Sequence, residues 1–369
     1  MNARTVRSYN QKLQERYDLA VPPVMTELYY QWESPCFGGV EFFSLEEIVG
    51  GYLRWCGMLP RFVPFAMDSF ERVYGFLARR GAPDPPILRY EKLPLGLEAS
   101  GKPLWMGCYQ PITSKFQSFL HWLLLVDRYE DDFEEESETT GPNRNDMAAL
   151  AKLPHYQLNQ TVVRNQQEFD SEMLRWDAQN VASLCRLGCV ALGNSNPERA
   201  LDFFYRASES APWFGDCSYL AAEAYFVQGD YERAARFWWH TIHTLFPFNT
   251  TSDNWDLGFE HPDGVIPLLA AQKLMDHAEY IEPALQADPL WMLAEEKLLR
   301  NLYARLNVGR FFQKYGEMAD AEREYLNALS LARKRRELKS AYDALIKLYE
   351  SQSQFNDAQI CMDDYLRDG

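Results

Sequence analysis

Two histidines are the side chains of this sequence that come nearest to a metal site. His240 and His243 lie three residues apart in an expected helix, and His261 and Asp263 follow downstream. Imidazole and carboxylate groups are common zinc ligands, but a zinc site also needs a fourth ligand and groups that orient the histidines, and neither is evident. We interpret the two histidines as part of an aromatic-rich helix surface and expect no metal and no cofactor.

The seven cysteines offer a second kind of chemistry. Cys185 and Cys189 are four residues apart and would share one face of a helix, yet no second pair completes a metal or redox motif. An odd number of scattered cysteines does not make a disulfide framework, so we expect reduced thiols. Cys185 and Cys189 are interpreted as small packing residues.

Neighbouring carboxylates such as Asp131 and Asp132 could serve acid–base catalysis, but they fall in a low-complexity run that would not hold them in a fixed geometry. The sequence also lacks the glycine-rich phosphate-binding motifs, the G-x-S-x-G nucleophile elbow and the H-E-x-x-H zinc motif. We therefore expect no catalytic residues and no enzymatic activity. An enzyme with an unrecognised site stays open as one hypothesis.

An internal repeat indicates the elements that position these side chains. The segment "NPERALDFF" at 196–204 aligns with "DYERAARFW" at 230–238, an offset of 34 residues, which is the tetratricopeptide period. Two further copies follow after an irregular segment that is mostly helical by its periodicity. The consensus positions are Leu187, Gly188, Ala200, Phe204, Ala207 and Pro212 in the first copy; Tyr225, Ala234 and Trp238 in the second; Val308, Gly309, Phe312, Ala321, Tyr325 and Ala328 in the third; and Leu345, Tyr349, Ala358 and Met362 in the fourth.

The pattern of small and aromatic residues has a steric reason. Small residues such as Gly188 and Ala200 let two antiparallel helices approach closely, while aromatic residues fill the space between neighbouring helix pairs. Residues 181–369 thus resemble tetratricopeptide repeat proteins, which are built as all-α helical solenoids.

The N-terminal part has a different pattern. Helices are expected at 5–17, 22–32 and 44–55, the last opened by a capping box of Ser44 and Glu47. Short runs rich in β-branched and aromatic residues predict strands at 39–43, 61–66, 72–78, 86–92 and 103–109, and a helix at 112–126 closes the region. The order predicts an α+β domain with a small, mainly antiparallel sheet.

Several motifs in this region resemble the SUKH superfamily over residues 5–126. They are "VPPVMTELY" at 21–29, the Gly38–Gly39 pair, "SLEEI" at 44–48, "FVPFAMD" at 62–68, "PPILRYE" at 85–91 and a helix that begins near Ser114, Lys115 and Phe116. The sequence departs from the family where "SFERVYGF" replaces the Gly-Asp that often follows the "PFA.D" strand. That departure concerns the edge of the sheet.

The resemblance implies a binding module. Bacterial SUKH proteins are mostly immunity proteins that neutralise secreted toxins, many of them nucleases, by direct contact, and others of the superfamily are regulators and adaptors. Two binding hypotheses follow: an immunity protein against a toxin, such as a type VI secretion or polymorphic effector, or a tetratricopeptide adaptor or chaperone that inhibits nothing. A toxin gene beside this one would favour the first.

The charge distribution defines both the expected domains and the expected partner. The chain carries a net charge of −16, and residues 127–146 contribute nine acids against two arginines. We expect a SUKH-like domain at 1–126, an acidic linker at 127–148 and a helical repeat domain at 149–369. A chain without a basic stripe is not expected to bind nucleic acid, whereas a basic toxin domain bound 1:1 would be attracted.

Two groups of residues are candidates for the contact with that partner. Asp216, Tyr219, Glu223 and Phe226 are expected to line the concave groove of the repeats, where carboxylates and aromatic rings suit a Lys or Arg side chain. The alternative is that the N-terminal domain or the irregular segment fills this groove. The second group lies in the acidic linker and comprises Asp131, Asp132, Glu134, Glu135 and Glu136.

The sequence also carries an expectation about localisation. The N-terminal segment is charged and has no apolar signal-peptide core, and the longest apolar run, at 119–126, is too short to span a bilayer. We expect a cytoplasmic protein without membrane contact.

Overall fold

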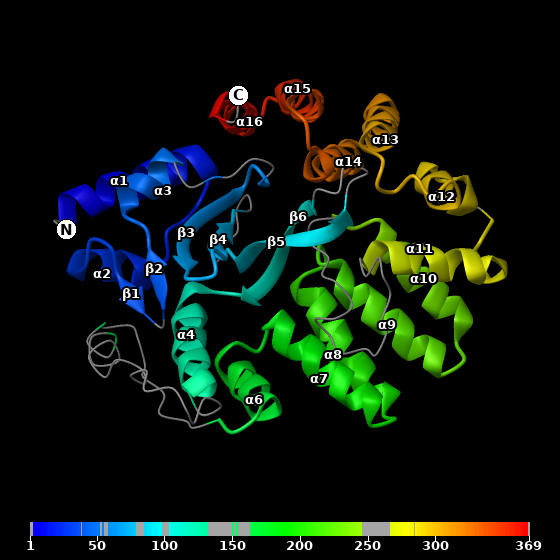
Figure 1. The fold of residues 1–369 in the computed structure, drawn as a ribbon, viewed down its shortest axis with the longest axis horizontal. Coiled ribbons are helices and arrows are strands. Elements are labelled where there is room, and N and C mark those ends of the chain that lie inside the picture. Colours follow the sequence, from blue (N-terminus) through cyan, green and yellow to red (C-terminus); the bar gives the residue numbers. More distant parts are fainter. Residues whose placement is uncertain are drawn as a thin grey trace. The chain divides into compact units, whose positions relative to one another are not determined.

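The computed structural model describes residues 3–37, 39–51, 54, 58–78, 85–97, 103–131, 150, 153, 163–245, 266–283 and 285–367. The chain divides into two compact units, each of which is made of separate stretches of sequence (Figure 1). The first unit comprises residues 1–54, 61–91 and 111–184, and the second comprises residues 55–60, 92–110 and 185–369.

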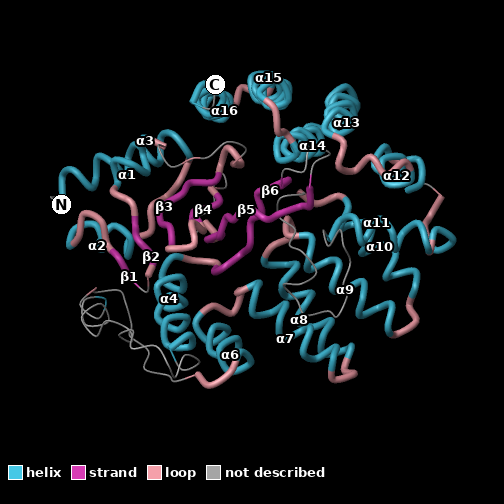
Figure 2. The backbone as a smooth tube through the Cα atoms, viewed as in Figure 1, coloured by secondary structure: helices cyan, strands magenta, loops and turns pink. Residues whose placement is uncertain are grey.

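The first unit is an α+β arrangement (Figure 2). Its helices are α1 (Ala3–Tyr17), α2 (Pro23–Gln31), α3 (Leu45–Gly50), α4 (Phe116–Asp131) and α6 (Gln166–Trp176). Its strands are β1 (Cys36–Phe37), β2 (Val40–Phe42), β3 (Phe62–Asp68) and β4 (Val73–Leu77), with β5 (Ile87–Leu97) and β6 (Pro103–Thr113) each shared between the two units. The expected order of elements is confirmed, and β1 is an additional strand.

The six strands form one sheet in sequential order, β1-β2-β3-β4-β5-β6. The pairs from β1 to β5 are antiparallel, with Val40 opposite Asp68 and Val73 opposite Tyr90. The register between β3 and β4 shifts between Pro64 and Ala66, because the extra residue Phe65 makes a bulge there. The predicted antiparallel sheet is therefore confirmed.

Aromatic side chains hold α4 against this sheet. Phe116 and Phe119, three residues apart on α4, meet Phe65 of β3 with ring centroids at 5.6 and 5.4 Å. Phe65 also lies 4.6 Å from Phe76 of β4, and all four rings are buried. Such pairs contribute about 0.5–1.5 kcal/mol each beyond their buried area. The core of the first unit is thus an aromatic layer between one helix and two strands.

The start of α3 agrees with the sequence, but its end does not. The Ser44 hydroxyl accepts a hydrogen bond from the Glu47 backbone N–H, and the Glu47 carboxylate accepts one from the Ser44 N–H, which confirms the capping box. The helix ends at Gly50, five residues earlier than expected. Gly51 adopts a left-handed conformation with φ of 65°, which only glycine takes without a steric cost, so it terminates the helix.

The boundary between the units differs from the expected linker at 127–148. Helix α4 continues to Asp131, so the first residues of that range are helical, and residues 132–148 lie outside the described part of the chain. Leu125 of α4 packs with Val163, Phe169 and Met173 in a buried cluster. Residues 163–184 therefore belong to the first unit, because their apolar side chains complete the core beneath α4.

Hydrogen bonds reinforce this assignment. The Ser114 backbone N–H and hydroxyl both donate to the Asp177 carboxylate, at 2.7 and 2.6 Å. The Asn180 side-chain amide donates to the Ile112 carbonyl at 2.7 Å. These bonds fix the end of β6 to the turn that precedes the first repeat helix. The turn at residues 177–180 therefore belongs to the first unit.

The second unit consists mainly of antiparallel helix pairs. Its helices are α7 (Val181–Gly193, which begins in the first unit), α8 (Pro197–Ser210), α9 (Gly215–Val227), α10 (Tyr231–Ile242), α11 (Ile266–Asp276), α12 (Pro289–Glu295), α13 (Leu302–Tyr315), α14 (Met318–Leu331), α15 (Arg335–Ser351) and α16 (Phe355–Arg367), with 3-10 turns at Ala278–Tyr280 and Leu285–Ala287. Both α9 and α10 begin 34 residues after α7 and α8, so the repeat read from the sequence is a repeat of structure.

In two of these helix pairs, a glycine on the first helix faces an aromatic ring on the second, which lets the two helices pack closely. A Cβ atom added to Gly188 of α7 would lie 2.3 Å from the ring of Phe204 on α8, and one added to Gly309 of α13 would lie 2.5 Å from the ring of Tyr325 on α14. No real Cβ approaches another carbon so closely, which confirms the steric reason for small residues at these positions. The second unit is a tetratricopeptide-like helical array.

A buried ion pair joins α13 to α14. The Arg305 guanidinium donates to Glu324 at 2.7 Å and to the Leu299 carbonyl at 2.9 Å, and neither charged side chain exceeds 1 % exposure. Such a pair offsets its own desolvation only when its hydrogen bonds are satisfied, so it fixes the pairing of the two helices more than it adds stability.

Among the described helices, none is both long and apolar enough to cross a membrane.

The contact between Gly188 and Phe204 generates a prediction. Gly188→Ala should lower the free energy of unfolding by about 1–3 kcal/mol, because the added methyl group overpacks the α7–α8 interface. The control is Gly193→Ala at the end of the same helix, where nothing lies within 4 Å. That substitution should be neutral or stabilising by up to about 1 kcal/mol, through helix propensity alone. Urea denaturation followed by circular dichroism measures both, and equal effects would contradict the packing argument.

Candidate partner-binding site

The four repeat residues expected to line a partner groove all lie on α9, but three of them are not on an open surface. Asp216, Tyr219 and Glu223 are 0, 1 and 4 % exposed, and Phe226 is half-buried. The expectation of an open groove at these positions needs correction, because other helices of the same unit enclose the side chains. Whether any of the four contacts a partner stays a prediction.

Helices α10 and α11 enclose Glu223. The Trp238 indole N–H of α10 donates to Glu223 Oε1 at 3.1 Å, and the Lys273 ammonium of α11 lies 3.7 Å from Glu223 Oε2. The Tyr219 hydroxyl, one turn earlier on α9, hydrogen-bonds the same carboxylate. Both carboxylate oxygens of this buried group are therefore engaged within the unit.

Lys273 occupies the position that the sequence analysis assigned to a partner's basic side chain. Its ammonium lies 4.6 Å from the ring centroid of Phe226 and 5.7 Å from that of Trp238, and its side chain is 27 % exposed. A cation over an aromatic face is attracted by the ring quadrupole, more strongly where water is excluded. The aromatic and acidic arrangement thus binds a lysine, and the lysine comes from the chain itself.

Burial perturbs the titration of this cluster. Desolvation raises the pKa of Glu223 above its ordinary value, and the Lys273 ammonium and the hydrogen bond from Trp238 offset only part of that shift. Desolvation and the neighbouring Glu223 raise the pKa of Tyr219 far above neutral pH. Tyr219 is therefore a neutral hydrogen-bond donor, and the ionised form of Glu223 depends on Lys273.

Aromatic rings continue from this inner cluster to the surface. Phe226 contacts His277 at 5.2 Å and Tyr231 at 5.4 Å between ring centroids, and Tyr231 lies 5.3 Å from Tyr280. Tyr231 and Tyr280 are 38 and 37 % exposed, and Val227 beside them is 64 % exposed. We call this surface the turn patch; it comprises Val227, Gln228, Gly229, Asp230, Tyr231, Glu232, Glu279 and Tyr280.

The turn patch is hollowed and acidic. A cavity of about 420 Å³ is lined by Gln228, Gly229, Asp230, Tyr231, Glu232 and Tyr280. The two flanking segments, 228–236 and 276–282, carry five carboxylates against two guanidinium groups, a formal net charge of −3. A cationic side chain would find aromatic faces and negative charge together here.

Two carboxylates of the patch have no cationic partner among the described residues. Asp230 pairs with Arg233 at 3.1 Å, and Glu282 pairs with Arg236 at 2.7 Å. Glu232 and Glu279 are exposed, and no such pair is found for either in the part of the chain that the structure describes. They are the charges available to an external cation.

The acidic-run candidates fall at the edge of the description or beyond it. Asp131 is the last residue of α4, and its side chain is not described. Asp132, Glu134, Glu135 and Glu136 lie outside the described residues, so their contact with a partner stays a prediction.

The histidine pair does not gather metal ligands. His240 is exposed, whereas the His243 ring lies tilted against Trp239, with ring centroids 4.5 Å apart, and its Nε2 is 3.9 Å from Asp288. Burial lowers the pKa of His243 to about 3, so it is neutral at physiological pH. His261 and Asp263 lie outside the described residues, within which no group of three or more His, Cys, Asp or Glu side chains is placed to hold a metal.

The cysteine pair is divided between two environments. Cys185 is fully buried, with its Sγ 3.6 Å from that of Cys217 on α9, and Cys189 is half-buried. Burial raises the pKa of the Cys185 thiol well above its ordinary value, which disfavours the reactive thiolate. Cys185 therefore occupies the interior as a packing side chain.

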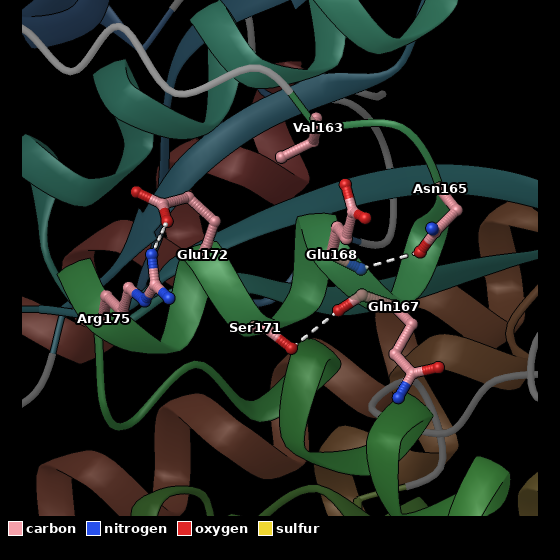
Figure 3. A pocket seen from close by; sticks show the side chains of 7 residues that line it. All are labelled: Val163, Asn165, Gln167, Glu168, Ser171, Glu172 and Arg175. Atoms are coloured by element: carbon pink, nitrogen blue, oxygen red, sulfur yellow. Dashed lines mark hydrogen bonds and ion pairs between the residues drawn. The ribbon is translucent and has the colours of Figure 1, made fainter.

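A second cavity, of about 460 Å³, lies along α6 in the first unit (Figure 3). Its side chains come from one helix and the turn before it, and they bond to one another: Arg175 pairs with Glu172 at 2.9 Å, and the Glu168 backbone N–H donates to Asn165. The Trp176 indole N–H donates to the other Glu172 oxygen at 3.0 Å. The polar groups are thus used in holding the helix.

Comparison with known proteins adds little to this picture. No protein-family model matches the sequence, and no curated protein matches it. Among solved structures, the chain is similar to YrrB, a TPR protein with an unusual peptide-binding site, at 17 % identity and a TM-score of 0.24 over 55 % of this chain and 92 % of that one. It is similar to MamA at 15 % identity and a TM-score of 0.18, over 55 % of this chain and 85 % of that one. It is also similar to the APC/C hetero-tetramer Cut9–Hcn1 at 14 % identity and a TM-score of 0.22, over 68 % of this chain and 45 % of that one. Such low TM-scores carry no argument, and the repeats are identified by their offset and their glycine contacts.

Lys273, Tyr231 and Tyr280 are absent from the sequence-based candidates. Lys273 and Tyr280 lie in the irregular segment between the second and third repeats, where the consensus gives no helix alignment. Tyr231 follows the turn of the second repeat, and the density of aromatic and acidic residues around it is the one signal that indicated an exposed patch. Lys273, Tyr231 and Tyr280 come close together because α10 packs against α11 and the 3-10 turn that follows it.

Lys273→Met tests the inner cluster. It should lower the free energy of unfolding near neutral pH by about 1–3 kcal/mol, less than for a fully buried pair because Lys273 is partly exposed. Because the folded-state pKa of Glu223 is raised, the carboxylate takes up a proton as the pH falls, and the loss should shrink near pH 5. Urea denaturation at both pH values measures the effect.

Two variants control this measurement. Glu223→Gln added to Lys273→Met should restore most of the loss, because it removes the uncompensated buried charge. Lys339→Met breaks an exposed pair with Asp343 and should cost less than about 0.5 kcal/mol at either pH. A pH-independent loss in Lys273→Met would show that the lysine contributes by packing alone.

Proposed function

We propose that this chain is a SUKH-type bacterial immunity protein that binds a cognate secreted toxin, a basic nuclease effector, and neutralises it by direct 1:1 contact. In this proposal the chain is not an enzyme, uses no metal or cofactor, binds neither nucleic acid nor membrane, and acts in the cytoplasm. The observation that carries the proposal is the turn patch, where exposed tyrosines border a cavity and the exposed Glu232 and Glu279 have no cationic partner among the described residues.

The chemistry of the patch supports a basic partner. A nuclease must carry Lys and Arg side chains around its active-site cleft to hold phosphates, so its surface complements an acidic, aromatic cavity. The environment of Lys273 also supports a basic partner, because within this unit the Lys273 ammonium already lies over aromatic rings and beside a carboxylate. The turn patch offers the same groups, Tyr231 and Tyr280 with Glu232 and Glu279, to an external cation.

The architecture of the first unit supports the SUKH assignment within the proposal. Two helices precede the sheet, the strands follow one another in sequential antiparallel order, and α4 packs on the sheet with Phe116 and Phe119. The motifs quoted for the resemblance fall on α2, the turn between β1 and β2, α3, β3, β5 and the start of α4. Their order along the chain is what supports the SUKH assignment within the proposal.

The tetratricopeptide-like pairs favour an alternative, which is an adaptor or chaperone. Stacked helix pairs bury a common core and present extended surfaces, and such arrays serve to bind proteins without altering their activity. An adaptor and an immunity protein would both bind at the turn patch. They differ in whether the bound partner loses its activity.

Coexpression with the product of a neighbouring toxin gene tests the proposed function. The chain should restore growth to cells that express the toxin domain and should abolish its nuclease activity at a 1:1 ratio. Glu232→Lys with Glu279→Lys should slow association by about tenfold at low salt, because steering depends on the field of the patch. Tyr231→Ala with Tyr280→Ala should raise the dissociation rate, as expected of aromatic anchors, by about 30-fold.

The matched control is Glu350→Lys on α15, an exposed carboxylate in another helix pair, which should leave both rates within about twofold. Binding without inhibition would select the adaptor instead. Binding that is insensitive to salt and to the turn-patch variants would contradict the proposed surface. Failure to protect the cell would contradict the immunity proposal itself.

A further inference from the structure

Helix α13 exposes a stripe of aromatic side chains. Tyr303, Phe311 and Tyr315 are 50, 44 and 62 % exposed. Their spacing of eight and four residues places them along one face of the helix. The rings of Phe311 and Tyr315 lie 4.7 Å apart, so these two side chains form a contiguous apolar surface. Surfaces of this kind mark sites of protein contact.

The same face of α13 is basic. Arg310 and Lys314 are exposed one residue before Phe311 and Tyr315, and the Lys314 ammonium lies 5.6 Å from the Tyr315 ring centroid. The fourteen residues of α13 include no Asp or Glu, and the remaining cation, Arg305, is buried in its pair with Glu324. In a chain of net charge −16, the exposed ionisable side chains within this helix are therefore cationic, and the next carboxylate along the chain is the exposed Glu317 just beyond its end.

Helix α15 packs against α13 and adds cations at its N-terminal end. Lys334, Arg335 and Arg336 are exposed, and within the described residues none of the three forms an ion pair. The one carboxylate nearby, Glu337, accepts hydrogen bonds from the backbone N–H groups of Arg333 and Lys334, so it caps the helix. Cations at a helix N-terminus oppose the helix dipole, so this arrangement adds to the positive potential instead of relieving it.

We propose that Tyr303, Arg310, Phe311, Lys314 and Tyr315 of α13, with Lys334, Arg335 and Arg336 at the start of α15, form a second docking face that binds an acidic amphipathic segment of another protein. The three aromatic rings supply the apolar anchors, and the five cations supply the charge complementarity. The turn patch has the opposite charge. The chain therefore has surfaces for two partners of opposite charge and can hold both at once.

The charge of the whole chain decides between an acidic protein segment and a nucleic acid. A long polyanion would extend well past the local cations into the field of a protein with net charge −16, which repels it. A short acidic segment stays close to the five cations, whose field is screened over about one Debye length, roughly 10 Å. The docking face depends on none of the residues of the turn patch, so the inference stands independently of the proposed function.

Fluorescence anisotropy with the full chain tests the docking face. The probe is a fluorescein-labelled amphipathic helical peptide with glutamate on one face and leucine on the other. It should bind with an affinity that falls at least about threefold between about 50 and 200 mM salt. Its counterpart with glutamine in place of glutamate should bind at least about tenfold more weakly.

Substitutions locate the binding. Phe311→Ser with Tyr315→Ser, and separately Arg335→Glu with Arg336→Glu, should each weaken the acidic peptide by at least about fivefold. The matched controls are Phe355→Ser, an exposed phenylalanine on α16, and Arg199→Glu on α8, which should change the affinity by less than about twofold. All six residues changed in the double variants and the controls are exposed. Circular dichroism verifies that each variant folds.

Four outcomes would overturn the inference. They are no binding of the acidic peptide, equal binding of the glutamine peptide, tighter binding of a single-stranded oligonucleotide, and a dimer in sedimentation that the Phe311 and Tyr315 substitutions abolish. The last two would assign the face to nucleic acid or to a second copy of this chain. Loss in both double variants with unchanged controls supports the docking face.

Discussion

The close approach of two helices, glycine against an aromatic ring, is the constraint on which the second unit depends. A Cβ atom at Gly188 or Gly309 would overlap the ring of Phe204 or Tyr325, so glycine lets these two hairpins close without displacing the ring. The closure sets the interhelical spacing, and the spacing sets which residues of one repeat meet the next. The positions of Glu223, Trp238 and Lys273 follow from that stacking.

The inner cluster shows how an interior charge is accommodated. Glu223 is ionisable and almost fully enclosed, which is costly unless its oxygens are paired. Trp238 and Lys273 supply the donors, and the rings of Phe226 and Trp238 in turn shield the ammonium. The same helices then carry aromatic rings outward to Tyr231 and Tyr280, so one continuous packing arrangement links the buried ion pair to the exposed, acidic turn patch.

The hydrophobic cores of the two units are built from different elements. The first unit buries aromatic rings between α4 and an antiparallel sheet, and it recruits residues 163–184 to cover the rest of α4. The second unit buries small and aromatic residues between stacked helix pairs. Both arrangements leave polar edges and exposed rings, and it is the sign of the charge around those rings that distinguishes the turn patch from the face of α13.

The sequence by itself determined the elements: the 34-residue offset predicted the helix pairs, short runs rich in β-branched and aromatic residues predicted the sheet, and Ser44 with Glu47 predicted a helix start. These features are local, because periodicity and capping depend on residues a few positions apart. Only the tertiary structure decided that Glu223 is enclosed, that Lys273 fills its aromatic surroundings, and that α6 belongs with α4. Burial and charge pairing arise between segments distant in the chain, and no spacing within one helix specifies which neighbour will cover it.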